Sequence, residues 1–198
     1  ANEVVVDKLN SSTAQGQVPT FGFENVYKPT EASLDGDTAL QVTKEVTGAP
    51  SAADYTFTLT AQDTAEGPIA NIGGLTEGKL TVSTNGVINQ DATDNTDDDT
   101  QTVSFGKLTF SKPGTYTFKV QENQPDADDG WTFDDANGDS ATDEHTVRVV
   151  VSDLNENNEY DGALHIQSVT PQGPTVITNS YKANPVIVGG DGADQQIT

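Results

Sequence analysis

A clear alternation of apolar and polar residues runs through Gly114-Thr115-Tyr116-Thr117-Phe118-Lys119-Val120-Gln121-Glu122. The apolar residues recur with a period of two, which is the pattern of a β-strand with one buried face. The same period recurs in seven other short blocks: Leu40-x-Val42, Tyr55-x-Phe57-x-Leu59, Leu80-x-Val82, Val103-x-Phe105, Val147-x-Val149-x-Val151, Leu164-x-Ile166 and Ile177-x-Asn179-x-Tyr181. Turn residues separate the blocks, and no segment has the pattern of a helix of three turns. The sequence therefore predicts an all-β sandwich or barrel.

The composition excludes several classes of function. The chain has 198 residues, enough for one or two domains with a hydrophobic core. It carries 9 Lys and Arg residues against 31 Asp and Glu residues, a formal charge of −22, which argues against binding to nucleic acid or to a membrane surface. It contains no Cys, which excludes disulfides, thiol nucleophiles and Cys-containing metal sites. No apolar stretch approaches the ~20 residues needed to span a bilayer.

A partial repeat indicates how the chain is organised. Residues 20–29 resemble residues 175–182, and the matching residues Asn25 and Asn179 are 154 positions apart (179 − 25 = 154). A spacing of about one domain is typical of a tandem array. We therefore predict three parts: N-terminal strands and a linker over residues 1–37 that resemble the end of a preceding repeat, one complete domain over 38–182, and a linker or tail over 183–198.

Three polar residues occupy the apolar faces of predicted strands. Lys44, Glu122 and Asn179 each share the parity of the apolar residues around them, so each side chain is expected to point into the core. Taken singly, each has a simpler explanation: Lys44 can extend past an apolar face to water, Glu122 can lie at an exposed strand end, and Asn179 can turn the chain. Chance is a poor explanation for three such polar residues on the apolar faces of three separate strands.

Burial gives these three residues a shared chemistry. A buried charge is costly, so burial lowers the pKa of a Lys and raises that of a Glu. A neutral Lys44 amine is a nucleophile, and a protonated Glu122 can hydrogen-bond to the side-chain carbonyl of Asn179 and pass a proton to the departing ammonia. The product is an amide between Lys44 and Asn179. In a sandwich the first and last strands can lie side by side, which would bring the two residues together.

Four segments follow one another in a recognisable order: Leu40-Gln41-Val42-Thr43-Lys44, Tyr55-Thr56-Phe57-Thr58-Leu59, the segment from Gly114 to Glu122, and Ile177-Thr178-Asn179-Ser180-Tyr181-Lys182. Together they resemble the pilin isopeptide linkage domains of Gram-positive surface proteins and streptococcal-type pilins. This resemblance implies an immunoglobulin-like β-sandwich with an intramolecular Lys–Asn isopeptide bond. Lys44 would be the nucleophile, Asn179 the acceptor amide and Glu122 the catalytic acid.

Asn25 is a candidate acceptor for a second cross-link, because its surroundings repeat those of Asn179. Its partner could be a Lys outside this chain or Lys8, which continues the face of Val4 and Val6; alternatively, Asn25 is unreacted. Lys28 and Lys182 could serve as sortase-type cross-linking sites, or they are solvated lysines at strand ends.

Several weaker patterns have both a functional and a structural interpretation. A calcium loop would use the alternating oxygen side chains of Asp153, Asn155, Asn157, Glu159 and Asp161, although a solvated hairpin loop explains the same pattern. A similar group in the acidic insertion at 126–144 comprises Asp134, Asp135, Asn137 and Asp139. Trp131 could stack on a sugar or anchor its long loop. His145 and His165 are expected to be structural.

These observations favour a structural stalk or shaft domain of a Gram-positive surface adhesin or pilus. It would lie outside the cell at the cell wall, with neighbouring repeat domains as its partners, and the cross-link would form once per molecule without enzymatic turnover. No cofactor is required, unless the calcium loop is occupied. The alternative is a ligand-binding adhesin module that recognises a host glycan or matrix protein through Trp131 and the acidic insertion.

Overall fold

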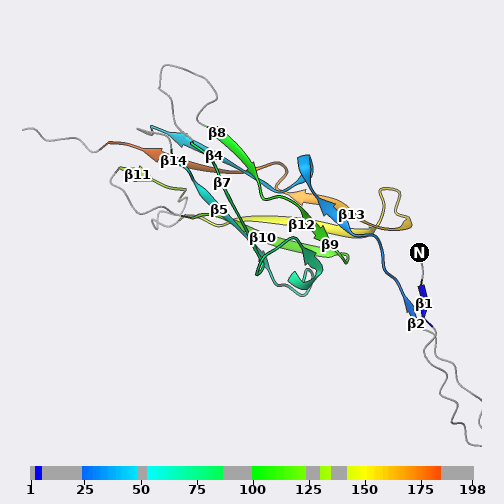
Figure 1. Ribbon diagram of the computed structural model, residues 1–198. Helices are drawn as coiled ribbons and strands as arrows, with labels where there is room; N and C mark the ends of the chain where they lie inside the picture. Colours follow the sequence, from blue (N-terminus) through cyan, green and yellow to red (C-terminus); the bar gives the residue numbers. More distant parts are fainter. Residues whose placement is uncertain are drawn as a thin grey trace, which may run out of the picture.

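The computed structural model describes residues 3–5, 24–48, 53–86, 100–123, 130–134 and 142–183, and within this part the chain forms strands and two short 3-10 helices (Figure 1). The elements in chain order are β1 (Glu3–Val5), β2 (Glu24–Val26), β3 (Ala32–Leu34), η1 (Gly36–Thr38), β4 (Gln41–Thr47), β5 (Thr56–Gln62), η2 (Ile69–Asn71), β6 (Ile72–Gly73), β7 (Lys79–Ser83), β8 (Thr100–Ser104), β9 (Leu108–Phe110), β10 (Gly114–Asn123), β11 (Trp131–Thr132), β12 (His145–Leu154), β13 (Tyr160–Thr170) and β14 (Thr175–Tyr181). The part of the chain that is described contains no helix long and apolar enough to cross a membrane.

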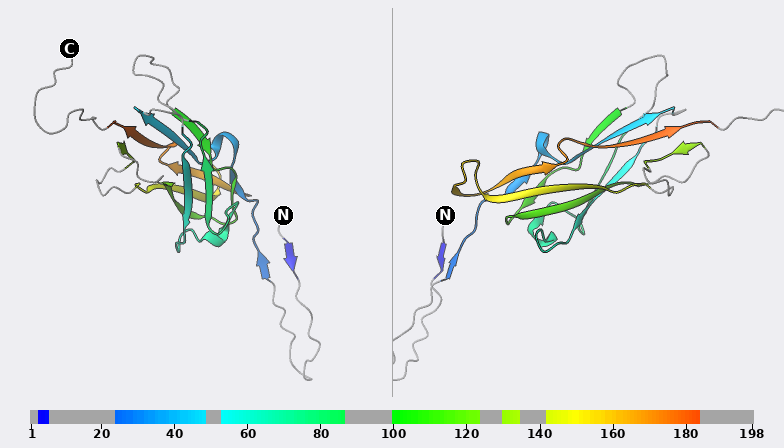
Figure 2. Two further views of the ribbon diagram at one scale, coloured as in Figure 1. Left: turned by 60° about the vertical axis from the view of Figure 1, so that its left-hand side comes forward. Right: turned by 180° about the vertical axis from the view of Figure 1, so that it is seen from behind.

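The main strands form two sheets that pack face to face (Figures 1 and 2). One sheet has five strands in the order β13-β12-β10-β5-β7, and the other has four in the order β11-β14-β4-β8. A small third sheet has the order β3-β9-β6. The all-β sandwich predicted from the alternating blocks is confirmed.

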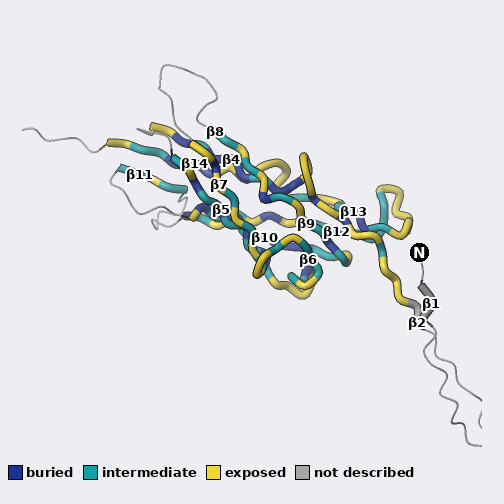
Figure 3. The backbone as a smooth tube through the Cα atoms, in the orientation of Figure 1, coloured by how far each residue is buried: buried dark blue, intermediate teal, exposed yellow. Residues whose placement is uncertain are grey.

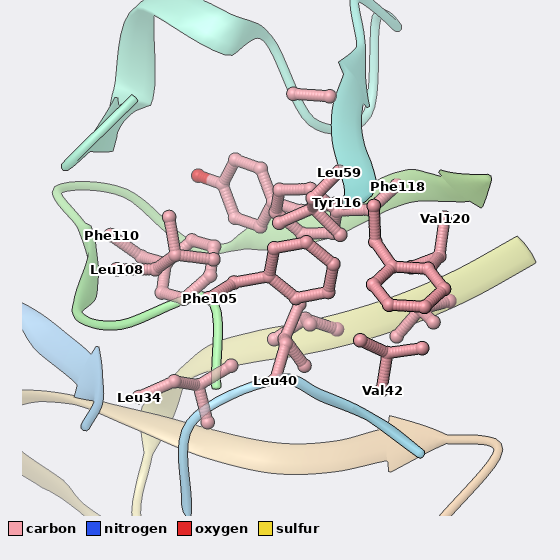
Figure 4. Packing of buried hydrophobic residues seen from close by; sticks show 14 of the residues in the cluster. Leu34, Leu40, Val42, Leu59, Phe105, Leu108, Phe110, Tyr116, Phe118 and Val120 are labelled. Carbon is pink, nitrogen blue, oxygen red and sulfur yellow. The ribbon is translucent and has the colours of Figure 1, made fainter. Parts of the chain in front are cut away.

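The core lies between the two sheets, where the buried positions of successive strands face one another (Figure 3). Aromatic rings and branched side chains from both sheets pack together there, among them Val42, Tyr116 and Phe118, which are fully buried (Figure 4). Ala32 and Leu34 of β3 precede the predicted domain start at residue 38 and are nevertheless buried in this core.

The first long strand of the sandwich and the last lie side by side. β4 and β14 pair in parallel, with Lys44 opposite Ile177 and Asn179 opposite Val46. The predicted proximity of the first and last strands is therefore confirmed. Because Lys44 and Asn179 share the core-facing side of neighbouring strands and are offset by two positions, their side chains approach each other diagonally.

The two N-terminal strands pair with each other, and this pairing sets Val4 opposite Asn25. The side chain of Asn25 and all of Lys8 lie outside the described residues, so the proposed pairing of these two residues stays a prediction. After β2 the chain joins the sandwich through a bridge between Thr30 and Ala163. Most of the predicted tail over 183–198 also lies outside the description.

Candidate functional site

The three polar residues singled out by strand parity meet inside the core. Lys44 from β4 and Asn179 from β14 belong to the four-stranded sheet, while Glu122 from β10 reaches them from the opposite sheet. Lys44 and Asn179 are 0% exposed and Glu122 is 2% exposed. All three side chains are thus removed from water, as their parity predicts.

The carboxylate of Glu122 bridges the other two side chains. Lys44 Nζ donates to Glu122 Oε2 at 3.1 Å, and Asn179 Nδ2 donates to Glu122 Oε1 at 3.0 Å. Each carboxylate oxygen therefore serves a different partner. One oxygen contacts the nitrogen of a potential nucleophile, and the other contacts the nitrogen of a potential leaving group.

The orientation of the Asn179 amide differs from the sequence-based expectation. We predicted that Glu122 would hydrogen-bond to the side-chain carbonyl, but the carbonyl oxygen Oδ1 instead accepts from the backbone N–H of Asp134 at 3.2 Å. Since a backbone N–H can only donate, the atom that faces it must be the oxygen, and the amide nitrogen must then face Glu122. The predicted contact between Glu122 and the carbonyl is therefore wrong, and Glu122 contacts the leaving nitrogen directly.

Burial drives Lys44 and Glu122 toward their neutral forms. Desolvation lowers the pKa of Lys44 from 10.5 to about 8, although the nearby Glu122 carboxylate opposes this shift. Desolvation also raises the pKa of Glu122, against the opposing effect of Lys44. Both shifts make it easier for a proton to move from the ammonium to the carboxylate, which leaves an uncharged amine beside the Asn179 amide.

Tyr55 forms part of the wall of this site. Its ring lies under Lys44, with Nζ 4.7 Å from the ring centroid, so the negative face of the ring stabilises the ammonium until it loses its proton. Desolvation, with a smaller contribution from Glu122, raises the pKa of Tyr55 to about 12, so its hydroxyl stays neutral. The Tyr55 hydroxyl is buried and has no hydrogen-bond partner within the described structure.

Two contributions to the site were not found from the sequence. The Asp134 contact uses a backbone N–H, and every residue except Pro has that group, so no side-chain pattern could reveal it. The alternation of residues places Tyr55 on a strand face, but its position beneath Lys44 depends on how the two sheets pack. His145, expected to be structural, forms an ion pair with the Asp134 carboxylate when its ring is protonated and so holds the loop that supplies the N–H.

Trp131 packs against the protein rather than standing free as a stacking platform. Its ring lies 5.2 Å from that of Tyr181 and 6.2 Å from that of Phe133, and it contacts the edge of the core. Its strand β11 pairs with β14, with Trp131 opposite Tyr181. These contacts favour the structural interpretation, in which Trp131 fastens the loop onto the strand that carries Asn179.

We expect Trp131→Ala to lower the free energy of unfolding by about 2 to 4 kcal/mol, somewhat less than the loss of a fully buried Trp because Trp131 is only partly buried. Urea unfolding followed by circular dichroism measures this change. Tyr160→Ala is a matched control, because Tyr160 is 71% exposed and its loss should change stability by less than about 0.5 kcal/mol. Equal stability of the two variants would contradict the anchoring role of Trp131.

Two of the five residues of the candidate calcium loop, Asn155 and Asp161, have partners for their side-chain oxygens within the protein. Asn155 Oδ1 accepts from the backbone N–H of Asn157 and of Glu159, and Asp161 Oδ1 accepts from Ala163. Asp161 also contacts the ring of His165. The loop is thus a hydrogen-bonded hairpin turn, and within the described residues no three His, Cys, Asp or Glu side chains are grouped to hold a metal.

The other candidates of the acidic insertion are only partly described. Asp134 is placed beside Asn179 and His145, while Asp135, Asn137 and Asp139 lie outside the described residues. Lys28 and Lys182 are exposed, and their use in cross-linking between molecules stays a prediction.

A comparison with models of known protein families gives a match over most of the chain. A family model described as FctA, Spy0128-like isopeptide containing domain, matches residues 40–182. The chain belongs to this family. The match spans Lys44, Glu122 and Asn179, and it confirms the resemblance to pilin isopeptide domains inferred from the motifs.

Solved structures of pilins are also similar to the chain. One is the major pilin from Streptococcus pyogenes, with 22% identity and a TM-score of 0.40, covering 72% of this chain and 50% of the pilin. Another is the major pilin protein (T-13) from Streptococcus pyogenes serotype GAS131465, with 22% identity and a TM-score of 0.41, covering 76% of this chain and 54% of the pilin. The chain thus spans about half the length of these pilins. No curated protein sequence matches it.

Proposed function

We propose that this chain is a shaft domain of a Gram-positive surface pilus or adhesin, locked by an isopeptide bond that Lys44 and Asn179 form with the help of Glu122. One observation carries the proposal: in a site closed to water, a single carboxylate contacts both the Lys44 amine and the nitrogen that Asn179 would lose. Membership of an isopeptide-containing family supports the same chemistry.

The reaction proceeds in three steps whose atoms balance. Glu122 Oε2 takes a proton from the Lys44 ammonium, and the neutral amine attacks Cγ of Asn179, so that the carbonyl electron pair moves to Oδ1. When the carbonyl re-forms, the bond between Cγ and Nδ2 breaks, and the leaving nitrogen takes a proton through Glu122 and departs as ammonia. Of the three ammonium protons, one stays on the new amide, one leaves with ammonia and one remains on Glu122.

This chemistry is maturation rather than catalysis with turnover, because each molecule consumes its own Lys44 and Asn179. The proposed linked unit is residues 38–182. Strand β3 packs into its core, and the rest of residues 1–37 and residues 183–198 would lead to neighbouring repeat domains of the same surface protein or pilus. Its place would be outside the cell, at the cell wall. Without Cys, the chain cannot form a disulfide, and a Lys–Asn bond would stabilise the domain without redox sensitivity.

Intact-mass measurement tests the proposal directly. We expect the purified domain to weigh one ammonia less than its calculated chain mass, and a proteolytic digest to contain one branched peptide joining Lys44 and Asn179. Glu122→Gln, which keeps the shape of the side chain but cannot relay the proton, should show the full mass. A wild-type chain at full mass would overturn the proposal.

Glu45→Gln is the matched control for this experiment. Glu45 is next to Lys44 on β4 and undergoes the same chemical change, but it points away from the core and accepts a hydrogen bond from Thr178. The Glu45 variant should lose ammonia as the wild-type chain does. Loss of linkage in both variants would show that the Glu122 effect is not specific to its position.

The rate of linkage should have a bell-shaped pH dependence. The ion pair and the reactive neutral pair hold the same number of protons, so the rate is level between the raised pKa of Glu122 and the lowered pKa of Lys44, about 8. Below this window both groups are protonated and no base remains. Above this window the Lys44–Glu122 pair has lost one proton, so no acid remains to protonate the leaving nitrogen of Asn179.

This pH dependence can be measured on chain kept unlinked in denaturant and then diluted into buffers of different pH. Ammonia loss is followed by mass, and folding is followed separately by Trp131 fluorescence. A rate that keeps rising well above pH 8 would show that the free amine alone is sufficient, which contradicts the role of Glu122 as an acid.

The alternative function is a ligand-binding adhesin module. The structure weakens the case for it, because Trp131 packs against Tyr181 and the core and does not stand free to bind a ligand. It stays a prediction for a host glycan or matrix protein, and binding panels test it. Saturable binding that Trp131→Ala abolishes at unchanged fold would favour it.

A further inference from the structure

The segment from Gly130 to Asp134 is held on both sides directly over the site. On one side it follows β14: Lys182 N donates to Gly130 O at 2.7 Å, and Trp131 and Thr132 pair with the strand. On the other side the backbone N–H of Asp143 donates to Asp134 O at 2.8 Å. The segment therefore connects the strand that carries Asn179 with the chain that leads into β12.

The start of this segment requires a glycine. Gly130 has a φ of +101°, and an added Cβ would lie 2.6 Å from the carbonyl oxygen of Lys182. A larger residue would push β11 away from β14 and shift the Asp134 backbone with it. The positive φ of Gly130 and its close contact with the Lys182 carbonyl therefore both help to position Asp134.

The backbone N–H of Asp134 points at the atom where negative charge would develop. It donates to Asn179 Oδ1 at 3.2 Å, on the side of the amide opposite the Glu122 contact. In the unreacted state this hydrogen bond withdraws electron density from the carbonyl. When the amine adds, Oδ1 becomes an oxyanion, and a donor already aimed at it stabilises that charge without reorganisation.

We propose that the Asp134 N–H is the oxyanion donor of the cross-linking reaction and that His145 is a positioning residue that acts through it. This inference rests on the proposed Lys44–Asn179 reaction. The donor makes and breaks no bond: the electron pair that moves to Oδ1 during attack returns to re-form the carbonyl as ammonia leaves. Glu122 accepts and donates the protons, and the Asp134 N–H stabilises the negative charge on Asn179 Oδ1.

His145 contributes through the side chain of Asp134. Its Nε2 contacts Asp134 Oδ2, so the loop is tied to β12 by a side-chain contact next to the backbone bond from Asp143. Because His145 touches none of the reacting atoms, its loss should loosen the N–H without removing it.

The test compares Asp134→Pro with Asp134→Ala. Both variants lose the carboxylate that pairs with His145, but only the Pro variant loses the N–H. We expect Asp134→Pro to slow ammonia loss by ~10² to 10³-fold, the usual effect of removing one oxyanion donor. Asp134→Ala and His145→Phe should cause much smaller losses. Asp134→Pro and Asp134→Ala should share one pH profile, because both lose the Asp134 carboxylate, whose charge raises the pKa of Lys44 and of Glu122, and the backbone N–H that distinguishes them does not titrate.

Folding is measured in a Lys44→Met background, where no link can form and melting temperatures report the fold alone. If Asp134→Pro fails to fold there, an ester in place of the peptide bond between Phe133 and Asp134 removes the same N–H with less disturbance. The inference is overturned if the Pro or ester chain folds and links as fast as Asp134→Ala. A wild-type chain that never loses ammonia would instead overturn the proposed reaction itself, so the two failures are distinguishable.

Discussion

We expect the Asn179→Ala variant to melt roughly 10 to 20 °C below the linked wild-type domain. The proposed bond joins residues 135 positions apart (179 − 44 = 135), and closing a loop of that length disfavours the unfolded state by about 5 kcal/mol. In a domain of this size each kcal/mol shifts the melting temperature by roughly 2 to 4 °C. The hydrogen bond between Asn179 Nδ2 and Glu122 Oε1 does not add to this difference, because Nδ2 has left as ammonia in the linked domain.

Two further variants separate the bond from the local contacts. Lys44→Met is also unlinked, but it removes the buried ammonium and leaves the contact between Glu122 and Asn179. Thr178→Ala changes an exposed residue of the same strand, keeps all three reacting groups and should melt within a few degrees of the wild-type domain. Calorimetry on the four proteins measures the shifts. An Asn179→Ala variant as stable as the wild-type domain would contradict a stabilising bond.

The strands that the sequence predicts best are those with one buried face. β5, β10, β12 and β14 each place several apolar residues at alternate positions, and this period survives in the fold because one side of each strand meets the core. β3, β6, β9 and β11 have three residues or fewer, too few to establish a period, and they depend on their neighbours for pairing. These short strands therefore form because of tertiary contacts, which the local sequence does not reveal.

The candidate site divides in the same way. Strand parity predicts that Lys44, Glu122 and Asn179 face the core, because parity is a local property of the backbone. It does not determine which atom of Asn179 meets Glu122, because that depends on the offset between the sheets and on a loop donor. The predicted carbonyl contact is wrong because the Asn179 amide lies with its oxygen toward the Asp134 N–H and its nitrogen toward Glu122.

The bond should also change how the domain responds to pulling at its two ends. β4 and β14 are parallel neighbours, so a load that enters before β4 and leaves after β14 pulls them in opposite directions and shears the hydrogen bonds between them. In the linked domain the load passes from Lys44 to Asn179 through covalent bonds and bypasses the interior. We therefore expect no unfolding step from that interior in single-molecule force spectroscopy of the wild-type domain.

The Asn179→Ala variant should show such a step, because its strands are joined by hydrogen bonds alone. Releasing the 135 positions between Lys44 and Asn179, each spanning about 3.4 Å when extended, should lengthen the chain by roughly 450 Å. Thr178→Ala should behave as the wild-type domain does, because its link is intact. If the wild-type domain also lengthens by the full step, the load does not pass through a covalent bond. If only Asn179→Ala shows the step, the mechanical strength of the domain depends on the bond between Lys44 and Asn179.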